Sequence, residues 1–152
     1  MIQFDDIGKI GKKKPKLKGS KVISLQEPLN GKWHVFLEDV PSVNHMYFNL
    51  RDRPGVKILT KVGREFKQTA ALLLKTACPL RDFEQKLVVE AIAHWPDRRR
   101  RDMNNYAKII CDSIEDAGIV KDDKVTLWRE MDWMLDPGVQ GFELTIYAKE
   151  SV

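Results

Sequence analysis

One segment limits the possible folds of this chain more than any other, the apolar run from Gln85 to His94. Its odd and even positions both carry apolar side chains, so neither face of the segment suits water. The odd positions hold Leu87, Val89, Ala91 and Ala93, and the even positions include Val88 and Ile92. Two apolar faces are typical of a strand in the buried centre of a sheet. We therefore expect a central strand here.

Periodic patterns on both sides of this segment predict the other elements. Residues 33–37 alternate as a strand does, and residues 56–59 suit a short strand, with a loop between them that begins at Pro41. Apolar side chains recur at helical spacing over residues 61–77 and 103–117. The first pattern stops before Pro79 and the second at Gly118. Asp102 or Asn104 is expected to cap the second helix.

Two more alternating segments, residues 125–133 and 142–148, flank the turn Asp136-Pro137-Gly138. Alternation on both sides of such a turn predicts an antiparallel hairpin. The order of elements then predicts an α+β fold. We expect a two-layer α/β sandwich, in which a mixed sheet carries two main helices on one face and ends in a C-terminal β-hairpin.

Basic side chains are concentrated near the start of the chain. The whole sequence has a net charge of +4, and residues 1–31 alone hold seven lysines against three acidic residues. We expect residues 1–31 to form a flexible lysine-rich arm and residues 32–152 to form one folded domain. Lys12, Lys13 and Lys14 would then bind nucleic-acid phosphates. A tail that serves only solubility is the alternative.

The sequence predicts a protein of the cytoplasm that does not enter a membrane. No apolar run approaches the ~18 residues that a spanning helix needs, and no signal peptide is recognisable. Cys78 and Cys111 stand alone, outside any C-x-x-C pattern. Isolated cysteines of this kind are typical of reduced, buried thiols.

The segment after the central strand combines two kinds of charge. Four arginines, Arg98 to Arg101, lead directly into Asp102. Guanidinium groups bind phosphate oxygens bidentately, and carboxylates are ligands for Mg²⁺ beside substrate phosphates. If the segment is extended, alternate arginines point in opposite directions, so one pair is expected to contact DNA and the other carboxylates or a partner subunit. A solvated basic face with Asp102 as a helix cap is the alternative.

Several motifs in order support a resemblance to a known family. They are Pro96-Asp97-Arg98-Arg99-Arg100-Arg101-Asp102-Met103-Asn104-Asn105, Lys108, Ala117-Gly118 and Asp122-Asp123, with the Pro41-Ser42-x-Asn44 loop before them. Together they resemble the RusA family of Holliday junction resolvases over roughly residues 33–148. The resemblance implies a homodimeric, metal-dependent endonuclease of bacteria or phages that binds branched DNA, the four-way junction, and nicks it symmetrically. Residues 32–152 would be a RusA-like endonuclease domain.

The resemblance also implies roles for individual residues. Asp102, Asp122 and Asp123 would bind Mg²⁺, for which Mn²⁺ is expected to substitute. Lys108 would stabilise the oxyanion that forms at the phosphate, although an i,i+4 ion pair with Asp112 is its alternative role. The DNA-binding residues would be Arg98, Arg99, Arg100, Arg101 and Asn105.

One position departs from the family pattern, because Asn104 stands where the second aspartate of the motif is expected. An amide brings no negative charge and is a poor Mg²⁺ ligand. The substitution predicts impaired catalysis with DNA binding retained, whether the asparagine is a natural variant or an engineered change. The alternative functions are therefore a module that binds branched DNA without cutting it and one that binds single-stranded nucleic acid.

Chain length also predicts how each site is assembled. A helix over residues 103–117 carries the chain about 22 Å away from Asp102. The residues from Gly118 to Asp123 span at most about 16–18 Å when extended, so Asp123 returns to Asp102 with difficulty. We expect composite sites in a twofold dimer, with Asp102, and Asn104 beside it, from one chain and Asp122 and Asp123 from its partner.

Overall fold

The structure is a computed structural model that describes residues 31–149 of the chain. Lys12, Lys13, Lys14 and nearly all of the expected arm lie outside the described residues. In chain order, the elements are β1 (Trp33–Glu38), α1 (Val43–Met46), β2 (Tyr47–Asn49), β3 (Lys57–Leu59), α2 (Lys61–Ala77), β4 (Leu87–Trp95), α3 (Asn104–Asp116), the 3₁₀ helix η3 (Asp123–Val125), β5 (Thr126–Leu135) and β6 (Gly141–Ala148).

The main sheet has four strands in the order β1-β6-β4-β5. Strand β4 lies inside it, antiparallel to β6 and parallel to β5, which confirms the expected central strand and mixed sheet. The predicted C-terminal hairpin is wrong, because β4 separates β5 from β6. The link after β5 instead crosses the end of β4, where the Asp136 N–H donates to the Trp95 carbonyl at 2.7 Å. Alternation reveals which side chains share a face, but it does not reveal which strand lies next to which.

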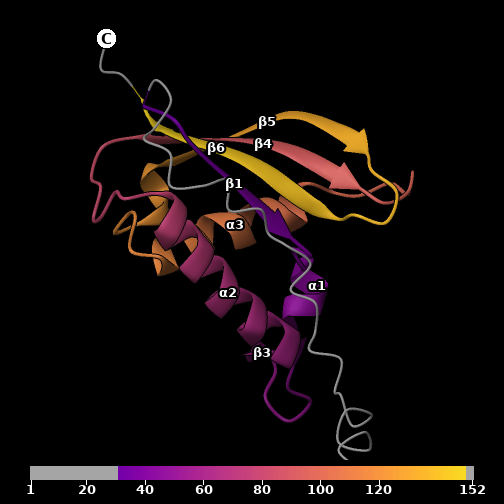
Figure 1. Cartoon of the computed structure of the whole chain (residues 1–152). Helices are drawn as coiled ribbons and strands as arrows, with labels where there is room; N and C mark the ends of the chain where they lie inside the picture. Colours follow the sequence, from indigo (N-terminus) through magenta and orange to yellow (C-terminus); the bar gives the residue numbers. More distant parts are fainter. Residues whose placement is uncertain (1–30, 150–152) are drawn as a thin grey trace, which may run out of the picture.

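The two long helices cover one face of this sheet (Figure 1). Alternate side chains of β4 face them, and these belong to the buried core together with residues of α3 and β6. The core includes Leu87, Val89, Ala91, Ala93 and Trp95 of β4, Ile109, Ile110 and Ile114 of α3, and Phe142, Leu144 and Ile146 of β6. This arrangement confirms the α+β class and the two helices on one face.

The ends of both helices follow from local hydrogen bonds. The Thr60 hydroxyl accepts the Gly63 N–H at 3.0 Å and caps α2, which has the predicted bounds. Helix α3 is one residue shorter at each end than predicted. The predicted N-cap of α3 is wrong, because Met103 holds that position and makes no side-chain capping bond. Asp102 stands one residue earlier, where its Oδ1 accepts the Asn104 N–H at 2.9 Å. Gly118 follows its end at a φ of 76°, a conformation that glycine adopts without strain.

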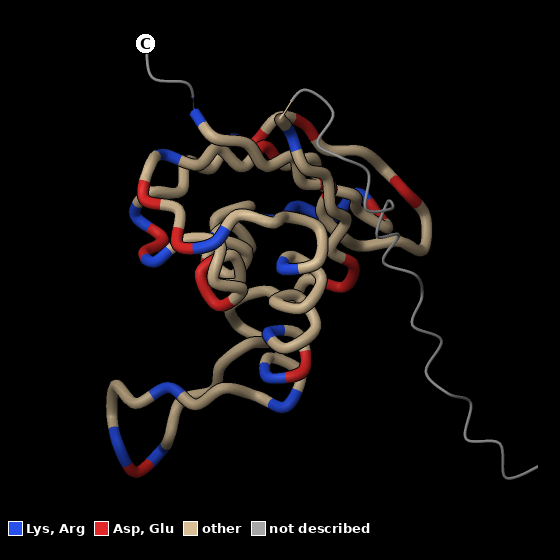
Figure 2. Tube along the Cα trace, turned by 60° about the vertical axis from the view of Figure 1, so that its left-hand side comes forward, with Lys and Arg blue, Asp and Glu red and all other residues tan. Residues whose placement is uncertain are grey.

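A second, two-stranded sheet of β2 and β3 projects from the body of the molecule (Figures 1 and 2). The expected loop after Pro41 is wrong in part, because this stretch contains the single-turn helix α1 and then β2. A four-residue helix and a three-residue strand are too short to produce a recognisable period. Within residues 31–149, no helix is long and apolar enough to cross a membrane.

Candidate functional site

The arginine loop, residues 96–101, joins β4 to the start of α3. Arg101 is held in place: its Nη1 donates to Asp97 Oδ1 at 2.8 Å, and its guanidinium lies 4.8 Å from the Trp95 ring centroid. The Arg99 N–H donates to the same carboxylate at 2.9 Å. These bonds, with that from Arg101 first, hold the pKa of Asp97 below its usual value. Arg101 therefore orders the loop.

Arg98 and Arg100 differ from their neighbours in the loop. Both are exposed, and within the described part of the chain neither forms an ion pair, whereas Arg99 Nε lies 3.8 Å from Asp97 Oδ2. Arg99 and Arg101 therefore contact the Asp97 carboxylate, while Arg98 and Arg100 are exposed to solvent. Two unpaired guanidinium groups are available to bind phosphates.

The start of α3 lines a hollow of about 530 Å³ beside the arginine loop. Asp102 and Asn104 are exposed there, and Glu130 of β5 completes the lining with Arg100, Arg101 and Met103. Sequence reasoning did not single out Glu130, because only the pairing of β5 with β4 brings it to the arginine loop. Further along α3, Asn105 is half-buried and Lys108 is exposed.

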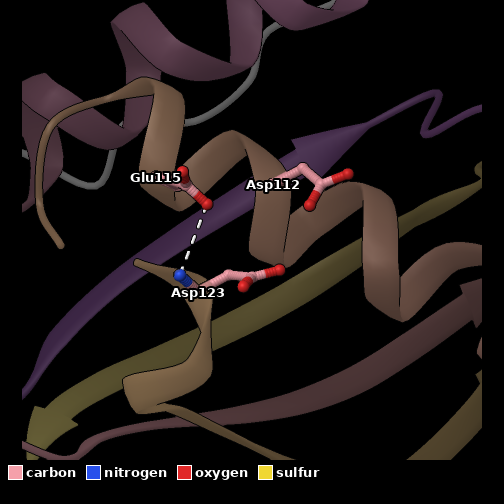
Figure 3. Close-up of side chains that lie close together, drawn as sticks. All are labelled: Asp112, Glu115 and Asp123. Carbon is pink, nitrogen blue, oxygen red and sulfur yellow. Dashed lines mark hydrogen bonds between the residues drawn. The ribbon is translucent and has the colours of Figure 1, made fainter. Parts of the chain in front are cut away.

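A separate group of three carboxylates, which we call the acidic cluster, lies towards the other end of α3 (Figure 3). It comprises Asp112 and Glu115 of α3 and Asp123 of η3, whose ligand atoms all lie within 4.8 Å of one another. The Asp123 N–H donates to Glu115 Oε2 at 3.3 Å, which joins the two elements. Three carboxylates at this spacing are a donor set suited to a hard divalent cation.

The environment of the acidic cluster changes the protonation of two of its groups. Partial burial, with the nearby Asp123 charge, raises the pKa of Asp112. Burial, with the charges of Asp112 and Asp123, raises the pKa of Cys111 to about 12. The Cys111 thiol therefore stays protonated at neutral pH, and the cluster itself offers only carboxylate oxygens.

The structure divides the expected metal ligands between the two ends of α3. Asp123 lies in the acidic cluster, whereas Asp122 is exposed and accepts the Lys124 N–H at 2.9 Å, a bond that lowers its pKa. Asp102 and Asn104 lie at the opposite end of the helix. The rise of a helix places Asn104 about 16 Å from Glu115 along the axis.

Two residues of the acidic cluster were not among the expected ligands. The sequence suggests Asp112 only as an ion-pair partner of Lys108, and it gives no role to Glu115. Their i,i+3 spacing on a helix was the available signal, since it places two carboxylates on one face. The position of η3, which brings Asp123 to that face, has no counterpart in the sequence pattern.

Comparison with known proteins identifies the family. A model of the family described as endodeoxyribonuclease RusA matches residues 38–140. The chain belongs to the RusA family. The crossover junction endodeoxyribonuclease RusA of Enterobacteria phage 82 is 29% identical over 91 residues, covering 60% of this chain and 73% of that protein. The protein of the same name from Escherichia coli K12 is 31% identical over 83 residues, covering 55% and 67%.

The RusA match includes both ends of α3. The arginine loop, the hollow with Glu130 and the acidic cluster all fall between residues 38 and 140. The lysines of the expected arm fall outside the matched range. The RusA-family part of the chain therefore carries every candidate residue that the structure describes.

Proposed function

We propose that this RusA-family chain is a metal-dependent endonuclease that binds four-way DNA junctions and resolves them by paired, symmetric nicks. The observation that carries the proposal is the exposed, unpaired Arg98 and Arg100 near Asp102 at one end of α3, together with the acidic cluster towards the other end. Phosphodiester hydrolysis needs both phosphate-binding groups and a possible metal site, and the chain supplies both. The similar phage and Escherichia coli proteins are named crossover junction endodeoxyribonucleases, which supports the four-way junction as substrate.

The acidic cluster fits a Mg²⁺ ion because its donors are all carboxylate oxygens within 4.8 Å of one another. In this proposal Asp112, Glu115 and Asp123 hold the ion, and Mn²⁺ can replace it. A Mg²⁺ ion held there would supply Lewis-acid chemistry, polarising the phosphodiester and making the attacking water easier to deprotonate. Asp122 is proposed to keep the turn before η3 in shape through its bond to Lys124.

The protein's own groups then position the substrate. Arg98 and Arg100 bind backbone phosphates, while the Arg101–Asp97 pair keeps the loop in place. Lys108 is exposed on α3, between Asp102 and the acidic cluster. It stabilises the oxyanion that forms at the phosphate. Asn105 and the lysines of residues 1–31, including Lys12, Lys13 and Lys14, add backbone contacts that depend on salt.

A homodimer is part of the proposal. Asp102 and the acidic cluster belong to opposite ends of one helix, so two antiparallel copies of α3 can bring Asp102 of one subunit to Asp123 of the partner subunit. Two such composite sites related by a twofold axis suit a substrate in which two strands are cut. Asn104 lies beside Asp102, in the part of the composite site that this subunit supplies. Its amide is a poor Mg²⁺ ligand and therefore weakens metal binding there.

The test is cleavage of a synthetic four-way junction with each strand end-labelled in turn. We expect nicks at symmetric positions in two opposing strands with Mg²⁺ or Mn²⁺ and none with EDTA. An Asn104→Asp chain serves as the active reference. Tight junction binding without cutting by both chains would instead assign a non-cleaving branched-DNA module, a function that Asn104 itself favours. Displacement of the junction by an equal amount of single strand would assign a single-strand binder.

A further inference from the structure

The outer half of β5 exposes an unusual amount of apolar surface for an edge strand. Trp133 is 56% exposed and Met131 is 55% exposed, with Met134 and Leu135 both at 42%. Trp133 pairs in register with Ala93 of β4, whose side chain belongs to the core on the helix-covered face. Paired side chains of neighbouring strands share a face, so Trp133 lies on that face but beyond the part the helices cover.

Trp133 forms one wall of a groove against the arginine loop. The groove has a volume of about 320 Å³, in the lower range of pockets that hold small ligands. Met103 and Trp95 add apolar surface to its lining, and Glu130 is also part of the lining. The arginine loop makes the rest of the lining charged, through Asp97, Arg98, Arg99, Arg100 and Arg101.

An aromatic face next to unpaired cations matches the chemistry of a nucleotide. Every base has a π-face that stacks on an indole regardless of sequence, and arginine binds the adjoining phosphate. In a continuous duplex the bases are already stacked and unavailable. At the centre of a branched DNA the stack is interrupted, so a base can leave it at the lowest cost.

We propose that this groove binds one unstacked nucleobase at the branch point, with Trp133 as the stacking surface and Arg98 and Arg100 on the flanking phosphates. The inference rests on the proposed junction substrate and adds a contact that recognises an interrupted stack. It gives the protein a means to distinguish a junction from a duplex, which phosphate contacts alone do not supply.

Charge argues against a second copy of the chain as the occupant of the groove. A twofold contact centred there would bring two arginine loops together, and like charges in an interface oppose association. The edge of β5 is also poorly suited to pairing with another strand. Its pairing with β4 has an irregularity between Ala91 and Ile92, and Met131 is skipped in the register. Arg129, Glu130 and Asp132 add charge beside it, and bulges and charges of this kind protect sheet edges.

The test uses the full chain, EDTA to prevent cutting, and a four-way junction with 5-iodouracil at the branch point. We expect ultraviolet irradiation to crosslink the base to Trp133, as located by mass spectrometry. Trp133→Ala is expected to lose this crosslink and to bind the junction about tenfold more weakly, with duplex affinity unchanged. Trp133→Phe should keep most of the affinity. Leu72→Ala, which removes a 67% exposed apolar side chain from α2, is the matched control and should behave as the unaltered chain.

Crosslinks elsewhere together with unchanged junction affinity in Trp133→Ala would overturn the inference. Dissociation of a dimer by Trp133→Ala would also overturn it, because the surface would then belong to a second copy. If the unaltered chain shows no preference for junction over duplex, the proposed function is refuted, but the stacking contact at Trp133 is not yet tested. The inference is then decided on a single-stranded oligonucleotide that carries 5-iodouracil, where a crosslink at Trp133 supports it and its absence overturns it.

Discussion

Replacing Asp112 with asparagine should have opposite effects on the metal-free and the metal-bound protein. Asp112 carries a raised pKa because burial and the neighbouring Asp123 both oppose its ionisation. The Asp112→Asn change removes this unfavourable charge but keeps the size of the side chain. We therefore expect the variant to be more stable than the unaltered chain in EDTA and to gain little stability from Mg²⁺.

The size of the effect follows from the spacing of the acidic cluster. At 4.8 Å, the limit within which its ligand atoms lie, two unit charges repel by about 0.9 kcal/mol in water and about 3.5 kcal/mol at an effective dielectric constant of 20. Glu115 is exposed and the other two are half-buried, so the lower figure is the better guide. Loss of the Asp112 charge removes repulsion within the cluster but also its attraction to Lys108, so the net stabilisation, which comes mainly from no longer burying a charge, is no more than about 1 kcal/mol. This free energy raises Tm by at most about 4 °C.

Thermal unfolding with and without metal is the appropriate assay. For a site with a Kd of about 1 mM, 10 mM Mg²⁺ should stabilise the unaltered chain by about 1.4 kcal/mol and raise its Tm by a similar ~4 °C. Glu65→Gln, on an exposed carboxylate of α2, is the charge control and should keep the full response to Mg²⁺. An Asp112→Asn protein that gains as much from Mg²⁺ as the unaltered chain would refute the assignment of the acidic cluster as a metal site.

The same variant has a defined dependence on pH. An acid whose pKa is raised in the folded state destabilises the protein above that pKa and has no effect once both states are protonated. The advantage of Asp112→Asn in EDTA should therefore be full at neutral pH. It should shrink as pH falls through the folded pKa of Asp112 and vanish below the unfolded value of about 3.9. An advantage that persists at the lowest pH would mean that charge is not its cause.

Three further predictions concern catalysis and DNA binding. Asn104→Asp is expected to raise Mg²⁺-dependent junction cleavage about 10²-fold or more with metal-free affinity nearly unchanged; equal single-turnover rates would make that ligand dispensable. Removal of residues 1–31 should flatten the dependence of log K on log salt by roughly 0.9 per lost phosphate contact, and an unchanged slope would assign the segment to another role. In an Asn104→Asp background, a mixed dimer of Asp102→Ala and Asp123→Ala subunits should recover nicking of one strand, because one composite site stays intact. Absence of nicking by well-formed mixed dimers would mean that each site is built within one chain.

The sequence was most informative where one period dominates a long segment. The bounds of α2 agree with the apolar pattern over residues 61–77, and the double-faced pattern of β4 identified the centre of the sheet. The partner of β5 was not predictable, because alternation is the same whichever strand lies beside it. The arginine loop was recognisable since its residues are contiguous. Glu130 and Trp133 were not, because they reach that loop only through the parallel pairing of β5 with β4.

The candidate site residues all lie on or beside the crossover from β4 through α3 to β5, and the elements that pack behind the site come from other stretches of the sequence. Every described candidate residue lies between Trp95 and Trp133, a continuous stretch of 39 residues, while β1, α1, α2 and β6 lie outside it. A genetic exchange confined to that stretch would transfer the arginine loop, Asp102, the acidic cluster and the stacking surface together. The remaining elements could then diverge between relatives under one requirement, to keep the two ends of α3 where they are.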